Sequence, residues 1–363
     1  MLLTSERRDL YLPLDELEIP PDARAKLEAL GITTVEELRA YWFYENRELL
    51  TEYLGDSPLN LVAIKPPAGA VRGMAAKGPG GSVNVLATGP VPPLRPMPRG
   101  VVLPPSQRLR RAAAPSMPPA TRRAGAKIAA KTVVSMTNQF PTPRNQGSRG
   151  TCVAFASVAF LEFQLAGGEA KTKPLSEQFV YWACKEADEL PTVAGTYLRV
   201  ARKILATRGD CRAATWKYET LPIGPTEGQG PPPQGAEQEA KQNQWKQARA
   251  LTRAQTVDIV GLCKRLHAKE PIVFSVRTFR NWDFQVVQET GEIPMPLPGA
   301  TPDGGHAIVL VGYEENPTAP GGGAFIFRNS WGKDWARLRG RHGGGYGTLF
   351  FDYVRDNALE AYC

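Results

Sequence analysis

The sequence predicts an α+β fold in which a helical half precedes a sheet half. Apolar helical patterns fill residues 152–205, and apolar strand-like runs fill residues 271–351. With 42% apolar residues in a chain of 363, the elements can bury a sizeable core. A helical half followed by a sheet half suits a two-part domain with a cleft between the parts. We therefore expect such a domain over residues 132–363, after a helical module at 1–56 and a linker at 57–131.

Residues 1–56 are expected to form a small helical module. Pro20-Pro21-Asp22 is typical of a helix start, Gly31 of a helix end, and Thr33-Thr34 followed by two glutamates of a second start. With its Leu-Gly-Ile turn, the segment resembles helix-hairpin-helix modules, in particular the C-terminal domain of the bacterial RNA polymerase α subunit. The resemblance implies binding of DNA or of protein. The acidic character of the segment weakens DNA binding, and a helical docking module or pro-region is the alternative.

The segment 57–131 is predicted to be a mobile or extended linker, because it is rich in Pro, Gly and Ala. It is basic in a chain whose net charge is +8, since no Asp or Glu occurs from Ser57 to Leu161. This charge fits either a solvated linker or attraction to a nucleic acid or acidic surface. The pairs Arg110-Arg111 and Arg122-Arg123 are likewise either solvated charge or processing points.

Three helices and an insert are predicted in the first half of the large domain. The apolar run that begins at Cys152 fits a buried helix with the cysteine at its N-terminus. Ser176 is the expected cap of a second helix, and residues 195–205 predict a third. A Pro-, Gly- and Gln-rich insert follows at about 222–240.

Four strands are predicted in the second half. Runs rich in β-branched and aromatic residues occupy 271–276, 306–313, 324–329 and 345–351. One of these strands begins with a histidine and another ends with an asparagine.

The cysteines and the N-terminus bear on the compartment of the protein. The five cysteines are odd in number and sparse, which argues against a secreted disulfide scaffold. No apolar signal segment follows the N-terminus, and no run approaches 18 apolar residues. We therefore expect a cytoplasmic protein without a membrane span, in which Cys184 and Cys211 are free thiols or form at most one bridge. Export by a signal-independent route is the alternative.

Cys152 is a candidate nucleophile, because a helix N-terminus stabilises a thiolate through unpaired amides and the macrodipole. Of the three histidines, His267 lies in a Lys- and Arg-rich helical stretch, where we expect it at the surface. His342 lies in a glycine-rich loop. His306 is therefore the candidate base, and Asn329 can accept its second ring N–H and fix the tautomer.

The order of these residues resembles the papain-like cysteine peptidases, in particular their bacterial-type members. Gln146 stands six residues before Cys152 within Asn-Gln-Gly-Ser-Arg-Gly-Thr-Cys-Val-Ala-Phe-Ala, and Gly-Gly-His and Arg-Asn-Ser-Trp-Gly motifs follow. The resemblance covers about residues 132–363 and implies the papain-like fold of two subdomains, a helical one and an antiparallel β one. It also implies an endopeptidase that forms a thioester acyl-enzyme, requires no metal or organic cofactor, and acts on protein or peptide substrates.

The same resemblance gives a role to each candidate residue. Cys152 would attack the peptide carbonyl, His306 would act as acid and base, and Asn329 would orient the imidazole. Gln146 would donate its side-chain amide to the oxyanion together with the Cys152 backbone N–H. Trp331 would shield the histidine–asparagine hydrogen bond from water.

Two glycines are candidates for the walls of the cleft. The resemblance places Gly195 in a glycine loop that holds an extended peptide, and a helix-start glycine is the alternative. Gly305 precedes His306 and allows close backbone approach. The chain departs from the family at Val153, where animal and plant relatives have Trp, and at Arg149, where secreted relatives have a disulfide cysteine.

Two other functions fit the same residues. An acyltransferase or deamidase is open because the nucleophile does not fix the acceptor. A catalytically idle protein that binds peptides, or docks on a partner through residues 1–56, is also open, although the complete set of four site residues disfavours it. Because an acid-free stretch directly precedes the site, we further expect the linker or the N-terminal module to gate the cleft.

Overall fold

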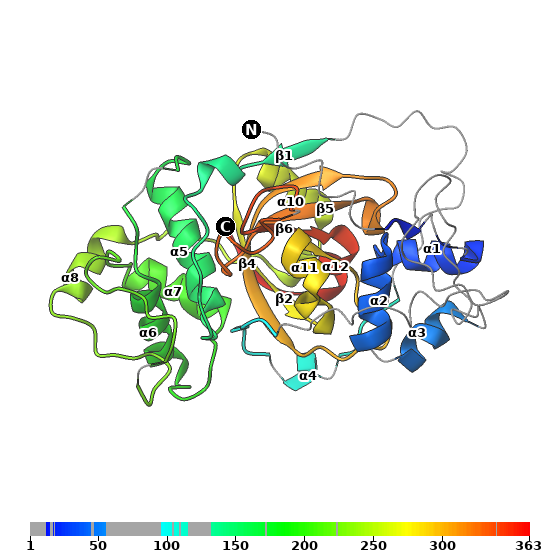
Figure 1. Ribbon diagram of the computed structural model, residues 1–363. Coiled ribbons are helices and arrows are strands. Elements are labelled where there is room, and N and C mark those ends of the chain that lie inside the picture. Colours follow the sequence, from blue (N-terminus) through cyan, green and yellow to red (C-terminus); the bar gives the residue numbers. More distant parts are fainter. Residues whose placement is uncertain are drawn as a thin grey trace.

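Figure 1 shows a computed structural model of the chain, which describes residues 12–14, 17, 19–44, 47–55, 96–103, 105–108, 110–114, 132–170, 173–222, 224–338 and 340–363. A helical half lies on one side of a seven-stranded sheet, and the N-terminal helices lie at the opposite end of the molecule. The expected α+β architecture is confirmed. The predicted dibasic pair Arg122-Arg123 lies outside the described residues.

The helical half is built around one buried helix. α5 is buried from Cys152 to Phe163, because it packs against β4, β2, α6 and α7, as an apolar helix must. α6 begins after Ser176, whose Oγ accepts the N–H of Phe179 at 3.0 Å and so forms the predicted cap. The elements of this half are α5 (Cys152–Leu165), α6 (Glu177–Asp188), α7 (Leu198–Thr207), α8 (Ala236–Ala240) and the 3-10 turn η6 (Lys241–Asn243).

The third predicted helix starts later than the sequence pattern suggests. α7 begins at Leu198, and Gly195 lies ahead of it with a φ of +91°. This left-handed backbone cannot belong to a right-handed helix. Gly195 is therefore not a helix-start residue.

The sheet half has the strand order β3-β6-β5-β4-β2-β7, with β1 paired to β4. β4 pairs antiparallel with both β2 and β5. All seven residues of β2 are buried, which is typical of a strand covered on both faces. The four predicted strands are present. The strands are β1 (Val133–Ser135), β2 (Ile272–Thr278), β3 (Glu292–Ile293), β4 (Gly304–Glu315), β5 (Gly323–Arg328), β6 (Tyr346–Phe350) and β7 (Ala358–Tyr362).

Short helices surround this sheet. α10 packs against β4, and α12 packs against β2, β5, β6 and β7. The helices and 3-10 turns are η5 (Thr137–Gln139), α9 (Arg253–Thr256), α10 (Ile259–His267), η7 (Arg280–Asp283), α11 (Gln285–Thr290), η8 (Pro320–Gly322) and α12 (Phe351–Asn357).

The N-terminal region forms three helices, α1 (Pro21–Ala29), α2 (Val35–Tyr44) and α3 (Arg47–Leu54). Gly31 adopts a φ of +74° between the first two, as its predicted place at a helix end requires. Glu37 caps α2, because its Oε2 accepts the backbone N–H groups of Thr33 at 2.8 Å and of Thr34 at 3.0 Å.

These helices dock on the sheet half. The carbonyl of Leu30 accepts the N–H of Met295 at 2.8 Å, and the hydroxyl of Tyr41 donates to the Met295 carbonyl at 2.5 Å. Gly31 lies directly against the ring of Phe350, where a Cβ would collide with the ring. The N-terminal helices and the sheet half thus share two buried hydrogen bonds, one between backbone groups and one from a side chain to the backbone.

Part of the expected linker packs between the two halves of the large domain. We call the described residues 96–103 and 105–108, which include α4 (Pro105–Arg108), the strap. Val102 donates its N–H to Thr196 O in the helical half at 3.1 Å, and Val101 donates to Gly305 O in the sheet half at 3.0 Å. The expectation that little of this segment packs is therefore wrong for the strap, whose backbone groups both halves satisfy.

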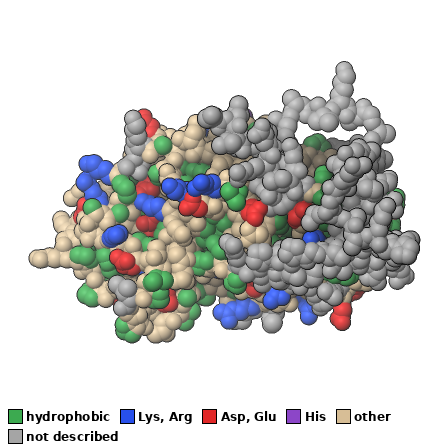
Figure 2. Space-filling view, in the orientation of Figure 1, with side chains coloured by type: hydrophobic (Ala, Val, Ile, Leu, Met, Phe, Trp, Pro, Cys, Tyr) green, Lys and Arg blue, Asp and Glu red, His purple; other side chains and the backbone are tan. Residues whose placement is uncertain are grey.

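Three further properties of the described residues bear on the expectations from the sequence. Within the described ranges, no helix is both long and apolar enough to cross a membrane. On the face shown in Figure 2, Lys and Arg side chains are interspersed with Asp and Glu, so this face has mixed charge. All five cysteines, Cys184 and Cys211 among them, are free thiols.

Candidate active site

Cys152 is the first residue of α5 and is fully buried. The backbone N–H of Ala307 donates to its Sγ at 3.4 Å, and the N–H of Gly100 in the strap is among the backbone groups that act on the thiol. Burial raises the pKa of the thiol to about 12, and the backbone N–H groups of Ala307, Gly100, Val153 and Cys152 oppose that rise because they stabilise the anion. With the strap in place, Cys152 is a neutral thiol.

His306 and Asn329 form a hydrogen-bonded pair. His306 Nε2 lies 2.8 Å from Asn329 Oδ1. The same Oδ1 accepts the backbone N–H of Ser330 at 2.8 Å, which identifies it as the amide oxygen. Nε2 must therefore carry the proton, and the lone pair of the neutral ring is on Nδ1. Nδ1 is buried and has no hydrogen-bond partner among the described residues.

Two tryptophans enclose His306. The ring of Trp331 lies 4.7 Å from the imidazole, tilted by 30°, and that of Trp282 lies 5.6 Å away at 70°. Both indoles are buried. Trp331 thus lies where the sequence analysis expects a shield for the imidazole. Trp282 comes from η7, and the sequence does not single it out because no local motif surrounds it.

The electrostatics of the closed cleft favour a neutral imidazole. Burial lowers the pKa of His306 to about 3, the hydrogen bond to Asn329 raises it, and the charge of Arg99 lowers it. The largest cause of the shift is the same for His306 as for Cys152, namely removal from water. Access of water to the cleft would therefore relax both shifts.

Gln146 is held at both ends of its side-chain amide. Ser330 Oγ donates to Oε1 at 2.6 Å, and Nε2 donates to the carbonyl of Arg149 at 2.7 Å. An amide nitrogen has two N–H groups, so one remains for an oxyanion. The backbone N–H of Gln146 also donates to Ser330 O at 2.8 Å. Ser330 is a positioning residue that the sequence does not single out, although it lies between Asn329 and Trp331.

Gly195 in the helical half and Gly305 in the sheet half both touch the strap. A Cβ on Gly195 would collide with the carbonyl of Gly100, and one on Gly305 would collide with Val101. Next to Gly195, the N–H of Thr196 donates to Gly100 O at 2.9 Å. Both glycines therefore permit the backbone approach that the sequence analysis expects of a peptide-binding cleft.

Arg99 anchors the strap by charge. Its guanidinium lies 2.9 Å from the carboxylate of Asp283 and 3.1 Å from that of Asp303. The Asp283 carboxylate also accepts the N–H of Met97 at 2.9 Å. Trp331 Nε1 donates to Pro98 O at 3.2 Å, so the strap is fixed beside the tryptophan that covers His306.

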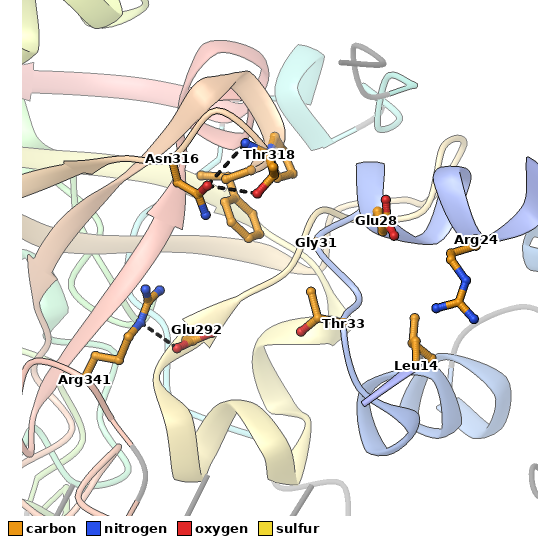
Figure 3. Close-up of a pocket in the computed structure, with 12 residues that line it drawn as sticks. Leu14, Arg24, Glu28, Gly31, Thr33, Glu292, Asn316, Thr318 and Arg341 are labelled. Atoms are coloured by element: carbon orange, nitrogen blue, oxygen red, sulfur yellow. Dashed lines mark hydrogen bonds and ion pairs between the residues drawn. The ribbon is translucent and has the colours of Figure 1, made fainter. Parts of the chain in front are cut away.

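Two of the cavities among the described residues bear on the location of the site. One, of about 200 Å³, borders the strap and is lined by Val101, Tyr197, Arg253 and Glu360 among others. A larger one, of about 520 Å³, lies between the N-terminal helices and the sheet half (Figure 3). Its walls contain none of the candidate site residues, so its size does not mark it as the reaction centre. The candidate site residues lie elsewhere, at the junction that the strap covers.

The other two histidines differ from His306. His267 is exposed in the last turn of α10, as expected. His342 lies 3.7 Å from Glu314. Only His306 of the three is next to a residue that bonds to Cys152, namely Ala307, whose N–H donates to the sulfur.

Comparison with known proteins agrees with this geometry. The family model for papain family cysteine proteases matches residues 131–342. An uncharacterized peptidase C1-like protein of Acanthamoeba polyphaga mimivirus is 29% identical over 223 residues, which cover 60% of this chain and 67% of that protein. The structure of xylellain, a cysteine protease from Xylella fastidiosa, matches with a TM-score of 0.55 and 22% identity over 74% of this chain and 96% of that chain. The likeness to xylellain supports the papain-like fold, and the family match covers more than half of the chain. The chain therefore belongs to the papain family of cysteine proteases.

Proposed function

We propose that this protein is a cysteine endopeptidase with Cys152, His306 and Asn329 as its catalytic triad and Gln146 as an oxyanion donor. The observation that carries the proposal is the tautomer of His306. Asn329 fixes the Nε2 proton and leaves Nδ1 as a base, while the next residue, Ala307, donates its N–H to the Cys152 sulfur. These contacts support a base on the residue next to the one that bonds to the thiol.

This arrangement supports a two-step hydrolysis. His306 Nδ1 takes the thiol proton, and the Cys152 sulfur attacks the peptide carbonyl carbon. The remaining N–H of the Gln146 amide and the backbone N–H of Cys152 donate to the oxyanion. His306 then protonates the leaving amine, which leaves a thioester, and a water that His306 deprotonates hydrolyses the thioester.

The proposal is tested with an unfolded protein substrate and an E-64-type epoxide, using the wild type, Cys152→Ala and His306→Ala. We expect internal peptide bonds to be cleaved by the wild type alone, and the epoxide to label Cys152 in a His306-dependent way. Mass spectrometry separates the alternatives. Products joined to an added amine would indicate an acyltransferase, and conversion of glutamine to glutamate without cleavage would indicate a deamidase. Labelling of Cys152 without any product would indicate an idle peptide-binding protein.

We also propose that the strap gates the cleft. A substrate must present a carbonyl carbon to Cys152, whereas the strap presents the backbone N–H of Gly100. Val101 pairs with Thr196 in parallel, and its N–H bonds to Gly305. These bonds support a strap that occupies the backbone groups of Thr196 and Gly305, which a peptide substrate would use. The strap does not present a peptide carbonyl to the Cys152 sulfur, so it would not be cleaved.

For residues 1–56, we propose docking on the catalytic domain of the same chain as their main role. The support is the pair of hydrogen bonds at the Met295 backbone, one with the carbonyl of Leu30 and one with the hydroxyl of Tyr41. Duplex DNA at low salt should then leave the electrophoretic mobility of the protein unchanged. A salt-sensitive shift would instead indicate the nucleic-acid role that the helix-hairpin-helix resemblance implies.

A further inference from the structure

The loop that carries Gln146 has one buried side-chain anchor between its two glycines. Gly147, at a φ of +64°, and Gly150 flank Ser148 and Arg149. Ser148 is exposed, whereas Arg149 is 3% exposed. Glycine adds backbone freedom on both sides, so the position of the Arg149 carbonyl depends on what holds the Arg149 side chain. That carbonyl accepts the Gln146 amide at 2.7 Å.

The guanidinium of Arg149 joins three separate segments. Nη1 donates to Gln178 Oε1 of α6 at 2.7 Å and to the carbonyl of Glu219 at 2.9 Å. Nη2 donates to the carbonyl of Glu227 at 2.8 Å. These acceptors are neutral, and they lie in different directions around a planar group. A guanidinium has five fixed N–H donors and satisfies such an arrangement, which an ammonium does not match.

Two tyrosine rings connect the same guanidinium to the site. The guanidinium carbon lies 5.0 Å from the ring of Tyr218 and 5.4 Å from that of Tyr181, within the range of cation–π attraction. The Tyr218 hydroxyl donates to the Gln146 carbonyl at 2.8 Å. The Tyr181 hydroxyl accepts the N–H of Gly195 at 3.0 Å.

We propose that Arg149 is the positioning residue that orients the oxyanion donor Gln146 and ties it to the cleft wall at Gly195. The inference rests on the proposed function, since it assigns Gln146 to the oxyanion. Arg149 acts on Gln146 through its own carbonyl and through Tyr218, and on Gly195 through Tyr181. It does not touch the reacting atoms itself.

The test compares Arg149→Lys and Tyr218→Phe with wild type in the full chain. Lysine keeps the positive charge but lacks the planar guanidinium with its fixed N–H donors. Phenylalanine keeps the ring but lacks the hydroxyl that bonds to Gln146. The matched control is Arg202→Lys on α7, where a half-buried guanidinium donates to the carbonyl of Ala248 at 3.2 Å. Hydrolysis rates are expressed per Cys152 that the E-64-type epoxide labels, because that labelling requires the assembled site and partial unfolding then does not mimic lost catalysis.

We expect kcat to fall by about 10- to 100-fold in Arg149→Lys, less than for complete loss of an oxyanion donor. KM should change far less, because the oxyanion exists only after attack. Tyr218→Phe should show a smaller loss in the same direction, and Arg202→Lys should match wild type. Equal losses in Arg149→Lys and Arg202→Lys, or an unchanged kcat in Arg149→Lys, would overturn the inference.

A second measurement does not depend on catalysis. In protein labelled with ¹⁵N-glutamine, the side-chain amide signals of Gln146 are identified by their absence in Gln146→Glu. They should move or merge in Arg149→Lys and stay in place in Arg202→Lys. Coincident signals in wild type and Arg149→Lys would refute the positioning role. If wild type shows no Cys152-dependent hydrolysis, the proposed function fails, and the amide signals alone decide whether Arg149 orients Gln146.

Discussion

Cys152 and His306 are both uncharged in the closed cleft, although nucleophilic attack needs a thiolate. The pKa of the thiol is raised to about 12 and that of the imidazole lowered to about 3, mainly because both groups are buried. Proton transfer from one to the other would create two charges in a dry site, which is costly. The reactivity of the pair therefore depends on access of water or of a polar substrate.

The protonation of His306 gives a direct test at the residue scale. A pKa near 3 means that the ring stays neutral as pH is raised from 5 to 9, so its ¹³C-detected ring signal should not move in this interval. His306→Ala identifies the signal, and the exposed His267 supplies a reference from solvent. An inflection between pH 5 and 9 in the wild type would contradict a closed, dry dyad.

Gln146 gives a second test at this scale. Gln146→Ala removes the proposed oxyanion donor, so kcat should fall by about 10²- to 10³-fold with a much smaller change in KM. Gln164→Ala, on the half-exposed side of α5, serves as the control. Peptide hydrolysis at saturating substrate measures the effect. Equal values for the two variants would remove Gln146 from the oxyanion site.

The residues of the site differ in how far the sequence predicts them. Cys152, His306 and Asn329 can be predicted because their chemistry, order and spacing are visible along the chain. Ser330 and Trp282 cannot, because they contact Gln146 and His306 only through the fold. No local pattern in the sequence encodes such long-range contacts.

At the scale of elements, three glycines bring the strap against the helical half. A Cβ on Gly100 would collide with the carbonyl of Gly150, one on Gly150 with the carbonyl of Arg99, and one on Gly195 with the carbonyl of Gly100. Backbone thus packs on backbone where α5 begins. This contact requires glycine both in the strap and in the helical half.

Gly100→Ala should therefore dislodge the strap and activate the enzyme. The added methyl has no room, so we expect Cys152 to react with iodoacetamide at least about 10-fold faster. This factor corresponds to a loss of about 1.4 kcal/mol in the free energy that favours the closed strap over the open one. Gly224→Ala is the control, because a Cβ there meets no atom within 4 Å. The rate of Cys152 alkylation is followed by mass spectrometry. Equal rates for both variants would show that the strap does not gate the cleft.

The sequence predicted the helices and strands better than the strap. The apolar period of α5 and the strand runs of β2 and β4 reflect burial within each element, so they can be recognised locally. The strap has no such period, because its backbone and not its side chains makes the defining bonds to Thr196 and Gly305. Its Pro- and Gly-rich composition therefore resembles that of a free linker.

At the scale of the whole molecule, a buried carboxyl lies in the N-terminal module. Glu37 caps α2 and is 6% exposed. Its pKa is raised to about 7, mainly by burial and to a lesser degree by the charge of Glu292, while the N–H groups of Thr33 and Thr34 oppose the rise. The folded protein thus binds a proton at Glu37 that the unfolded chain releases near pH 4.5.

The sign of the resulting pH dependence follows from linkage. Because the folded-state pKa is the higher one, Glu37 imposes no penalty below about pH 4.5, and the penalty grows until pH 7, to the order of 3 kcal/mol. Glu37→Gln keeps an acceptor for the Thr33 and Thr34 amides without the charge. We expect its melting temperature to exceed that of wild type at pH 8 and to lose this advantage at pH 5. The exposed Glu52→Gln on α3 is the control for charge alone. If the melting temperatures of Glu37→Gln and wild type differ by the same amount at pH 5 and pH 8, the Glu37 carboxyl is not buried as a protonated acid in the docked module.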